Sequence, residues 1–163
     1  MNLLGTLAQK VSKILPNITI RLPNPITGIK QDYLSRFYVF LADREFGNIF
    51  IHEFHSSDLD VGEGGHGLLH NHPFKWSFSF VLVNGYWEER LNPDQTVSKK
   101  FVKPFSFNFL SRKDFHRVDL VDGNKKAWTI FVTGPRSSRG SWGFYDRVTK
   151  QYRDWTTSPN AVK

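Results

Sequence analysis

From about residue 33 onward, the chain is a succession of short β-prone segments separated by turn residues. They include NIFIHEFH at 48–55, SFSFVLV at 77–83, HRVDLVD at 116–122 and AWTIFVT at 127–133. Each segment either alternates in polarity or is rich in β-branched and aromatic residues, which is typical of strands. The 15 Phe, 5 Trp and 5 Tyr supply the bulky side chains that a β core needs. The pattern therefore predicts an all-β sandwich or barrel.

One short helix is expected before these strands. Residues 3–15 have helical spacing that places Leu3, Leu7 and Val11 on one face with three further aliphatic residues, Leu4, Ile14 and Leu15. We expect that face to pack on the outside of the domain. A chain of 163 residues is long enough for one domain. The sequence predicts a helix and extended arm over 1–32, a barrel over 33–155 and a loose tail over 156–163.

Composition excludes several classes of protein. The chain has no Cys, which excludes disulfides, thiolate metal sites and thiol nucleophiles. It has no signal-peptide pattern and no apolar run long enough to cross a membrane, so a cytoplasmic protein is expected. The net charge of +7 favours an anionic partner. No motif indicates nucleic acid, so a small anionic molecule is the expected ligand.

Two histidines stand two residues apart in the stretch LLHNHPF. On a strand, His70 and His72 would share one face and Asn71 would point to the other. Two neutral imidazoles side by side suit a divalent metal ion, and His116, which opens a later strand, is the best third ligand. Three protein ligands leave positions open for water or substrate, as in catalytic sites. The alternative is a pair of loop histidines that make turn hydrogen bonds.

At this point the chain resembles the cupin superfamily, whose first motif has H-x-H followed by a Gly that ends the strand pair, here His70, His72 and Gly85. A second motif carries a further metal histidine, matched by His116. The blocks H-x-H-P, G-Y-x-E, H-R-V, T-G-P-R and W-G-F, over residues 38–155, also resemble an uncharacterised cupin-like family of bacteria and their viruses. The resemblance implies a double-stranded β-helix, or jelly-roll barrel, with a short N-terminal helix.

The resemblance also bears on the metal. The carboxylate of the cupin motif would fall at 76–78, where the chain has Trp76, Ser77 and Phe78. The pattern is therefore similar to three-histidine cupins such as the thiol dioxygenases. It implies a divalent metal with Fe(II) preferred, while Zn, Mn and Ni are alternatives for the same ligands.

Other polar residues are candidates for roles around this centre. His52 and Glu88 are candidate catalytic residues: His52 shares a face with aromatic residues, and Glu88 follows the Asn-Gly turn. A core histidine and a surface carboxylate are the respective alternatives. Candidate substrate-binding residues are Arg90, Arg117, Arg136 and Trp76, because guanidinium groups hold carboxylates and phosphates with paired hydrogen bonds.

Three kinds of function fit these observations. The first is a metal-dependent enzyme, foremost a three-histidine Fe(II) oxygenase of the dioxygenase type acting on a small anionic substrate, or else an isomerase or lyase with Zn, Mn or Ni. The second is a non-catalytic module that binds an anionic small molecule such as a nucleotide or a phosphorylated sugar. The third is an assembly role, with a homodimer formed through the barrel and the N-terminal helix.

Overall fold

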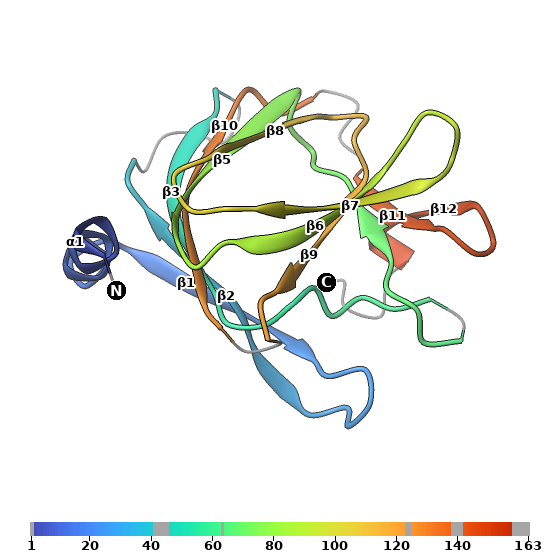
Figure 1. Cartoon of the computed structure of the whole chain (residues 1–163), viewed down its shortest axis with the longest axis horizontal. Coiled ribbons are helices and arrows are strands. Elements are labelled where there is room, and N and C mark those ends of the chain that lie inside the picture. The colour runs from blue at the N-terminus through green and yellow to red at the C-terminus, as the bar shows by residue number, and fades with distance from the viewer. Residues whose placement is uncertain (1, 41–45, 63, 123–124, 138–141, 158–163) are drawn as a thin grey trace.

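Two six-stranded antiparallel sheets make up the bulk of the computed structural model, which describes residues 2–40, 46–62, 64–122, 125–137 and 142–157 (Figure 1). Among these residues, the first sheet has the order β1 (Asn17–Pro23), β2 (Lys30–Tyr38), β3 (Asn48–Phe54), β10 (Ala127–Thr133), β5 (Trp76–Val83) and β8 (Phe107–Ser111). The second has the order β12 (Gln151–Asp154), β11 (Gly143–Asp146), β4 (Leu69–His70), β9 (His116–Leu120), β6 (Tyr86–Leu91) and β7 (Val97–Val102). The prediction of an all-β jelly-roll fold with a short N-terminal helix is confirmed by these two sheets.

The strand predicted over residues 127–133 is also confirmed. The segment 127–133 forms β10, which lies inside its sheet between β3 and β5. The C-terminal hairpin is formed by β11 and β12, which pair antiparallel and are followed by the short 3₁₀ helix η1 (Trp155–Thr157). Residues 158–163 of the expected tail lie outside the described residues.

The N-terminal helix α1 (Leu3–Ser12) begins after Asn2, whose side chain accepts a hydrogen bond from the Gly5 amide as an N-cap. The predicted buried face is wrong in part. Gly5, Ala8 and Ser12 are the buried residues, whereas Leu3 is 84% exposed. Ala8 belongs to a core cluster with Leu82 and Trp128, and Val11 and Leu15 of the predicted face pack against this cluster. No helix among the described residues is long and apolar enough to cross a membrane.

The extended arm after the helix takes part in the first sheet. Residues 17–23 form β1, which pairs antiparallel with β2 along its whole length. Because β2 begins at Lys30, the expected boundary between residues 32 and 33 falls within a strand. The arm thus extends the sheet that carries one wall of the site.

The Asn-Gly pair connects the two sheets and does not close a hairpin. Asn84 and Gly85 both have positive φ, 64° and 77°, and they join β5 in the first sheet to β6 in the second. A Cβ on Gly85 would lie 2.6 Å from the Val102 carbonyl oxygen, so the turn needs glycine for space as well as for its backbone conformation. This crossing sends Tyr86 and Glu88 into the second sheet.

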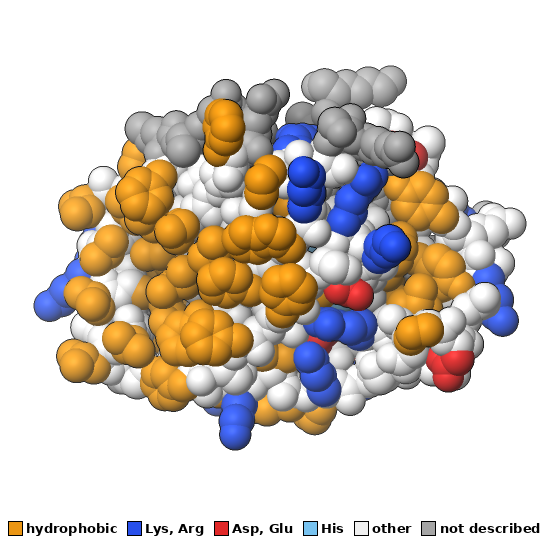
Figure 2. All heavy atoms as spheres, turned by 90° about the horizontal axis from the view of Figure 1, so that it is seen from above, with side chains coloured by type: hydrophobic (Ala, Val, Ile, Leu, Met, Phe, Trp, Pro, Cys, Tyr) orange, Lys and Arg blue, Asp and Glu red, His pale blue; other side chains and the backbone are white. Residues whose placement is uncertain are grey.

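Large hydrophobic side chains are exposed as well as buried. Phe107 and Phe109 on β8 are 71% and 57% exposed. Figure 2 shows hydrophobic side chains gathered over a broad area of one face, beside a group of lysines and arginines. The apolar surface of the chain is therefore not confined to its core.

Candidate metal centre

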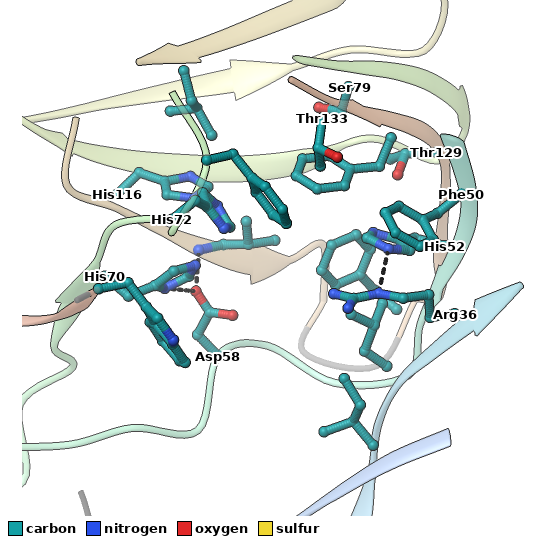
Figure 3. A pocket seen from close by; sticks show the side chains of 18 of the residues that line it. Arg36, Phe50, His52, Asp58, His70, His72, Ser79, His116, Thr129 and Thr133 are labelled. Atoms are coloured by element: carbon teal, nitrogen blue, oxygen red, sulfur yellow. Dashed lines mark hydrogen bonds and ion pairs between the residues drawn. The ribbon is translucent and has the colours of Figure 1, made fainter. Parts of the chain in front are cut away.

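Three imidazoles meet on the inner side of the second sheet. His70 on β4 is the direct cross-strand partner of His116 on β9, and His72 follows two residues later (Figure 3). The Nε2 atoms of His72 and His116 are 2.9 Å apart, and one nitrogen from each of the three rings lies within 4.8 Å of the others. Two nitrogens bound to one metal at their usual bond lengths are about 3 Å apart. The donor set therefore fits one divalent ion.

A buried carboxylate backs His116. The Oε1 atom of Glu88 lies 3.0 Å from His116 Nδ1, and the Glu88 side chain is fully buried. Burial raises the pKa of the Glu88 carboxyl, but His116, Asn108 and Arg90 outweigh it and hold the pKa at about 2. The ionised carboxylate accepts the Nδ1 proton of His116, which leaves the Nε2 lone pair facing the other histidines.

Glu88 is itself held by polar side chains from β6, β7 and β8. Asn108 donates to its Oε1 atom at 2.6 Å, and Lys100 Nζ lies 3.2 Å from its Oε2 atom. Arg90, an expected substrate-binding residue, donates to Glu88 Oε1 at 3.2 Å and to the Phe109 carbonyl at 3.0 Å. The structure thus connects Arg90 to the histidines through Glu88 and does not place it in the cavity wall.

A second carboxylate backs His70. Asp58 Oδ2 lies 3.4 Å from His70 Nδ1 and accepts a hydrogen bond from the Val118 amide at 2.7 Å, while Tyr33 donates to Oδ1. Burial raises the pKa of Asp58, but His70, Arg117 and these hydrogen bonds outweigh it and lower the pKa. Arg117, another expected substrate-binding residue, donates to the Asp58 carbonyl and so holds the loop that carries this carboxylate.

His70 and His72 are uncharged near neutral pH. Burial lowers the pKa of His70 to about 4, and the Asp58 carboxylate offsets only part of this effect. The pKa of His72 is well below its usual value because of burial, the neighbouring His70 and His116, and the charge of Arg36. Neutral imidazole is the form that binds metal, so these rings need not lose a proton first.

Asn71 confirms the expected alternation of side chains. Its Nδ2 donates to the Arg112 carbonyl at 3.1 Å, and its Oδ1 accepts from the Gly143 amide at 2.8 Å. Both partners are backbone groups of segments that are far from Asn71 in the sequence but adjacent to it in space. The Asn71 side chain therefore links its own segment to those of Arg112 and Gly143.

The histidines form one end of a cavity of about 530 Å³ that is lined by residues of both sheets. Arg36 and His52, on the first sheet, lie on the other side of the cavity from the histidines (Figure 3). His52 is buried and stacks on Phe131, and burial together with Arg36 lowers its pKa well below the usual value. His52 is therefore a neutral residue of the cavity wall.

The two other expected substrate-binding residues differ in position. Arg136 lines the cavity and is exposed. Trp76 is 38% exposed, stacks on Phe78 and does not line the cavity. Of the four, only Arg136 therefore lines the same cavity as the three histidines.

Three residues of the site were not singled out from the sequence. Asp58 lies in a connecting segment, HSSDLD, that has no motif. Tyr33 and Arg36 stand in a β-prone segment whose alternation predicts shared faces but does not say which sheet faces them. The strand period gave no signal for this pair, because strict alternation puts Tyr33 and Arg36 on opposite faces of β2. Both line the cavity, and the register between β1 and β2 shifts at Tyr33, between the pairs Ile20–Leu34 and Arg21–Asp32.

Comparison with family models of protein sequences found no match, and comparison with curated proteins found none either. Solved structures do match. Fe(II) HppE in complex with substrate aligns with a TM-score of 0.51 at 13% identity, over 75% of this chain and 57% of that chain. Hydroxypropylphosphonic acid epoxidase from S. wedmorenis aligns with a TM-score of 0.51 at 12% identity, over 75% and 56%. A cupin-2 domain from Rhodospirillum rubrum has a TM-score of 0.48 at 11% identity, over 76% and 72%.

The chain thus spans a little over half the length of the two epoxidase structures. Identities this low bear on the fold alone. The chain has a jelly-roll fold of the kind found in the iron-containing epoxidase.

Proposed function

We propose that the chain is a metal-dependent oxygenase that holds one divalent ion, preferably Fe(II), with His70, His72 and His116, and that acts on a small organic anion. The observation that carries this proposal is the convergence of three imidazoles at one end of a cavity, two of them backed by buried carboxylates. Solved structures with a similar fold include Fe(II) HppE, which supports iron as the metal.

The chain's own residues give such an ion a defined setting. Glu88 and Asp58 hold the Nδ1 side of His116 and His70, so that both rings keep their orientation. When bound, Fe(II) would supply open coordination positions and a redox couple for the reaction of dioxygen with substrate. Three imidazole ligands carry no negative charge, so an anionic donor of the substrate would compensate the charge of the ion.

The cavity supports an anionic substrate in two further ways. Arg36 and Arg136 are among its lining residues and add positive potential. Much of the remaining wall is apolar, with Phe50, Phe131 and Leu110 among the lining residues, and such a wall limits the access of bulk water to reactive species.

Metal content is the first test. Protein purified without added metal should contain close to one equivalent of a divalent ion, and His72→Ala should lose it while keeping the far-ultraviolet spectrum of the wild type. His55→Ala is the matched control, because His55 bonds Ser35 and does not line the cavity. Full occupancy in a variant with alanine at all three positions would contradict the proposal. Zinc in place of iron would favour a lyase or isomerase.

Oxygen uptake is the second test. The Fe(II) protein, prepared without oxygen, should consume oxygen when it is mixed with air and with one member of a panel of thiols, keto acids and other small anions. His116→Ala should abolish the uptake that depends on the substrate. A ligand that binds tightly and is recovered unchanged would instead favour a binding module without turnover.

A further inference from the structure

The first sheet has an outer face as well as the inner face that lines the cavity. On β10, β5 and β8, the side chains that alternate with the cavity-lining residues Thr129, Ser79 and Leu110 belong to this outer face. The strand register sets six of them, none charged, in two rows across the sheet: Val132–Phe78–Phe109 and Ile130–Phe80–Phe107. These six side chains and Trp76, which shares their face on β5, are called the outer aromatic face below.

The rings of the outer aromatic face contact one another. The Trp76 ring stacks on Phe78 with 6.3 Å between the ring centroids. The Phe107 ring lies 6.2 Å from Phe78 and 4.8 Å from Phe80, again between centroids. Trp76 also lies over Gly134, where an added Cβ would collide with the indole ring. The rings therefore form one continuous apolar surface.

Helix α1 covers only one part of the outer aromatic face. Phe80 and Ile130 pack against the core cluster that contains Ala8 of this helix. Phe107, Phe109 and Trp76, by contrast, are 71%, 57% and 38% exposed. The structure thus leaves the part of the face on β5 and β8 open.

The exposed apolar area is close to what a dimer interface needs. At about 200 Å² for a whole aromatic side chain, Phe107, Phe109 and Trp76 together expose roughly 330 Å², and the half-buried side chains bring the face to about 450 Å². Apolar patches of this size are often functional. A stable dimer buries about 800 Å² on each partner, of which roughly 60% is apolar. The outer aromatic face supplies nearly all of that apolar share.

The face is more open to a partner than the edge of the sheet. β8 is the last strand in the order of the first sheet, and Arg90 donates to its Phe109 carbonyl at 3.0 Å. Open strand edges tend to pair with other chains, but here a side chain already occupies part of the edge. Two sheets can instead pack face to face, about 10 Å apart, with interdigitating side chains. A twofold contact presents the same surface from both copies, and uncharged rows suit such a contact.

We propose that two copies of this chain associate through the outer aromatic face, with β5 and β8 of one copy packed on β5 and β8 of the other around a twofold axis. The inference goes beyond the proposed function and holds with or without a bound metal, because the histidines lie on the inner side of the sheets. A second copy fits better than an acidic protein, because the rows at the centre carry no charge. Their area also matches the apolar core of a dimer.

Sedimentation velocity of the whole chain, from about 1 to 100 μM, is the main test. We expect twice the monomer mass, with a dissociation constant of about 1 μM or lower. The double variant Phe107→Thr with Phe109→Thr should raise this constant at least about a hundredfold, because it removes the two most exposed rings of the face. Threonine is β-branched and suits a strand, so the far-ultraviolet spectrum should not change.

The second sheet offers a matched control. Trp87 and Phe101 lie on neighbouring strands with their rings 5.3 Å apart, and each is 41% exposed. Trp87→Thr with Phe101→Thr therefore also removes two exposed rings, but from a different sheet. This variant should keep the dissociation constant of the wild type.

Cross-linking tests the same contact with nearly all of the face intact. The chain has no Cys, so one introduced thiol is unique. Phe107→Cys should give a covalent dimer with a short bismaleimide at low protein concentration, whereas Trp87→Cys should stay monomeric under the same conditions. This comparison decides the matter even if the double threonine variant does not fold. Equal cross-linking of the two variants would overturn the inference.

Salt separates an apolar contact from a charged one. Each copy carries a net charge of +7, so two copies repel each other. Raising the NaCl concentration from about 0.1 to 1 M should therefore strengthen the association or leave it unchanged. A dimer that dissociates in high salt, or one that survives the loss of Phe107 and Phe109, would contradict the proposal. So would a chain that stays monomeric at about 100 μM, and binding of that monomer to vesicles of anionic lipid would assign the face to a membrane instead.

Discussion

His116 and Glu88 face each other from neighbouring strands of the second sheet, with Nδ1 and Oε1 3.0 Å apart. The carboxylate is fully buried and ionised, so the imidazole has one preferred tautomer and one orientation. The chain lacks a carboxylate at residues 76–78, where the cupin motif has one. It has a carboxylate directly behind a candidate metal-binding histidine instead. Glu88, expected as a catalytic group, touches the site through His116.

Replacing Glu88 by Gln should weaken metal binding by roughly tenfold to a hundredfold, because the neutral amide orients His116 less strongly. The measurement is a competition titration with a chromophoric chelator. Glu89→Gln is the control, since Glu89 pairs with Lys99 and Arg147 away from the histidines. Equal losses in the two variants would mean that the effect comes from general charge and not from the contact with His116.

Replacing Asn71 by Ala should lower the free energy of unfolding by about 2 to 4 kcal/mol. The Gly143 amide and the Arg112 carbonyl would each lose a partner in a buried setting. Urea denaturation measures the change. Asn92→Ala removes the same number of side-chain hydrogen bonds at the surface and should cost less than about 1 kcal/mol. A small effect at Asn71 would show that water replaces both bonds.

Glycine substitutions should separate backbone strain from crowding. Gly28 and Gly85 both have positive φ, but a Cβ on Gly28 meets nothing within 4 Å, whereas one on Gly85 lies 2.6 Å from the Val102 carbonyl oxygen. Gly28→Ala should cost about 1 to 2 kcal/mol from its backbone conformation alone. Gly85→Ala should cost at least about 1 kcal/mol more because of the clash. Thermal unfolding of both variants measures the two losses of stability. Equal losses would contradict the expected clash of a Cβ at residue 85.

Alkaline pH should destabilise the fold through Tyr86. Burial raises the pKa of this phenol to about 12. Between pH 10 and 12 the folded state keeps a proton that the unfolded chain has lost, so stability is full below pH 10 and falls as the pH rises to 12. The contribution of Tyr86 is about 2 to 3 kcal/mol.

The pH dependence can be assigned by difference. The slope of unfolding free energy against pH should be shallower in Tyr86→Phe than in the wild type above pH 10. The two slopes should agree between pH 8 and 9, where neither state loses the phenolic proton. Parallel slopes above pH 10 would mean that Tyr86 does not hold its proton in the folded protein.

The sequence alone determined the local features of this protein. A period of two along residues 116–120 and 127–133 is enough to predict strands. The H-x-H spacing predicts that His70 and His72 act as a pair, and both belong to the group of three histidines, although β4 ends at His70. Turn chemistry located the change of direction at Asn84 and Gly85. These features depend on residues that are close together in the sequence, so they can be predicted without knowledge of the fold.

Tertiary structure decided which faces meet. The strand period says which side chains share a face but not which strands pair or in what register. Register placed Arg36, His52 and Thr129 in one row, and the jelly roll set that row opposite the histidines. Long-range packing likewise brought Asp58 from a loop without a motif to His70. Contacts between residues far apart in the chain depend on how the whole chain buries its apolar surface, and no short stretch of sequence contains that information.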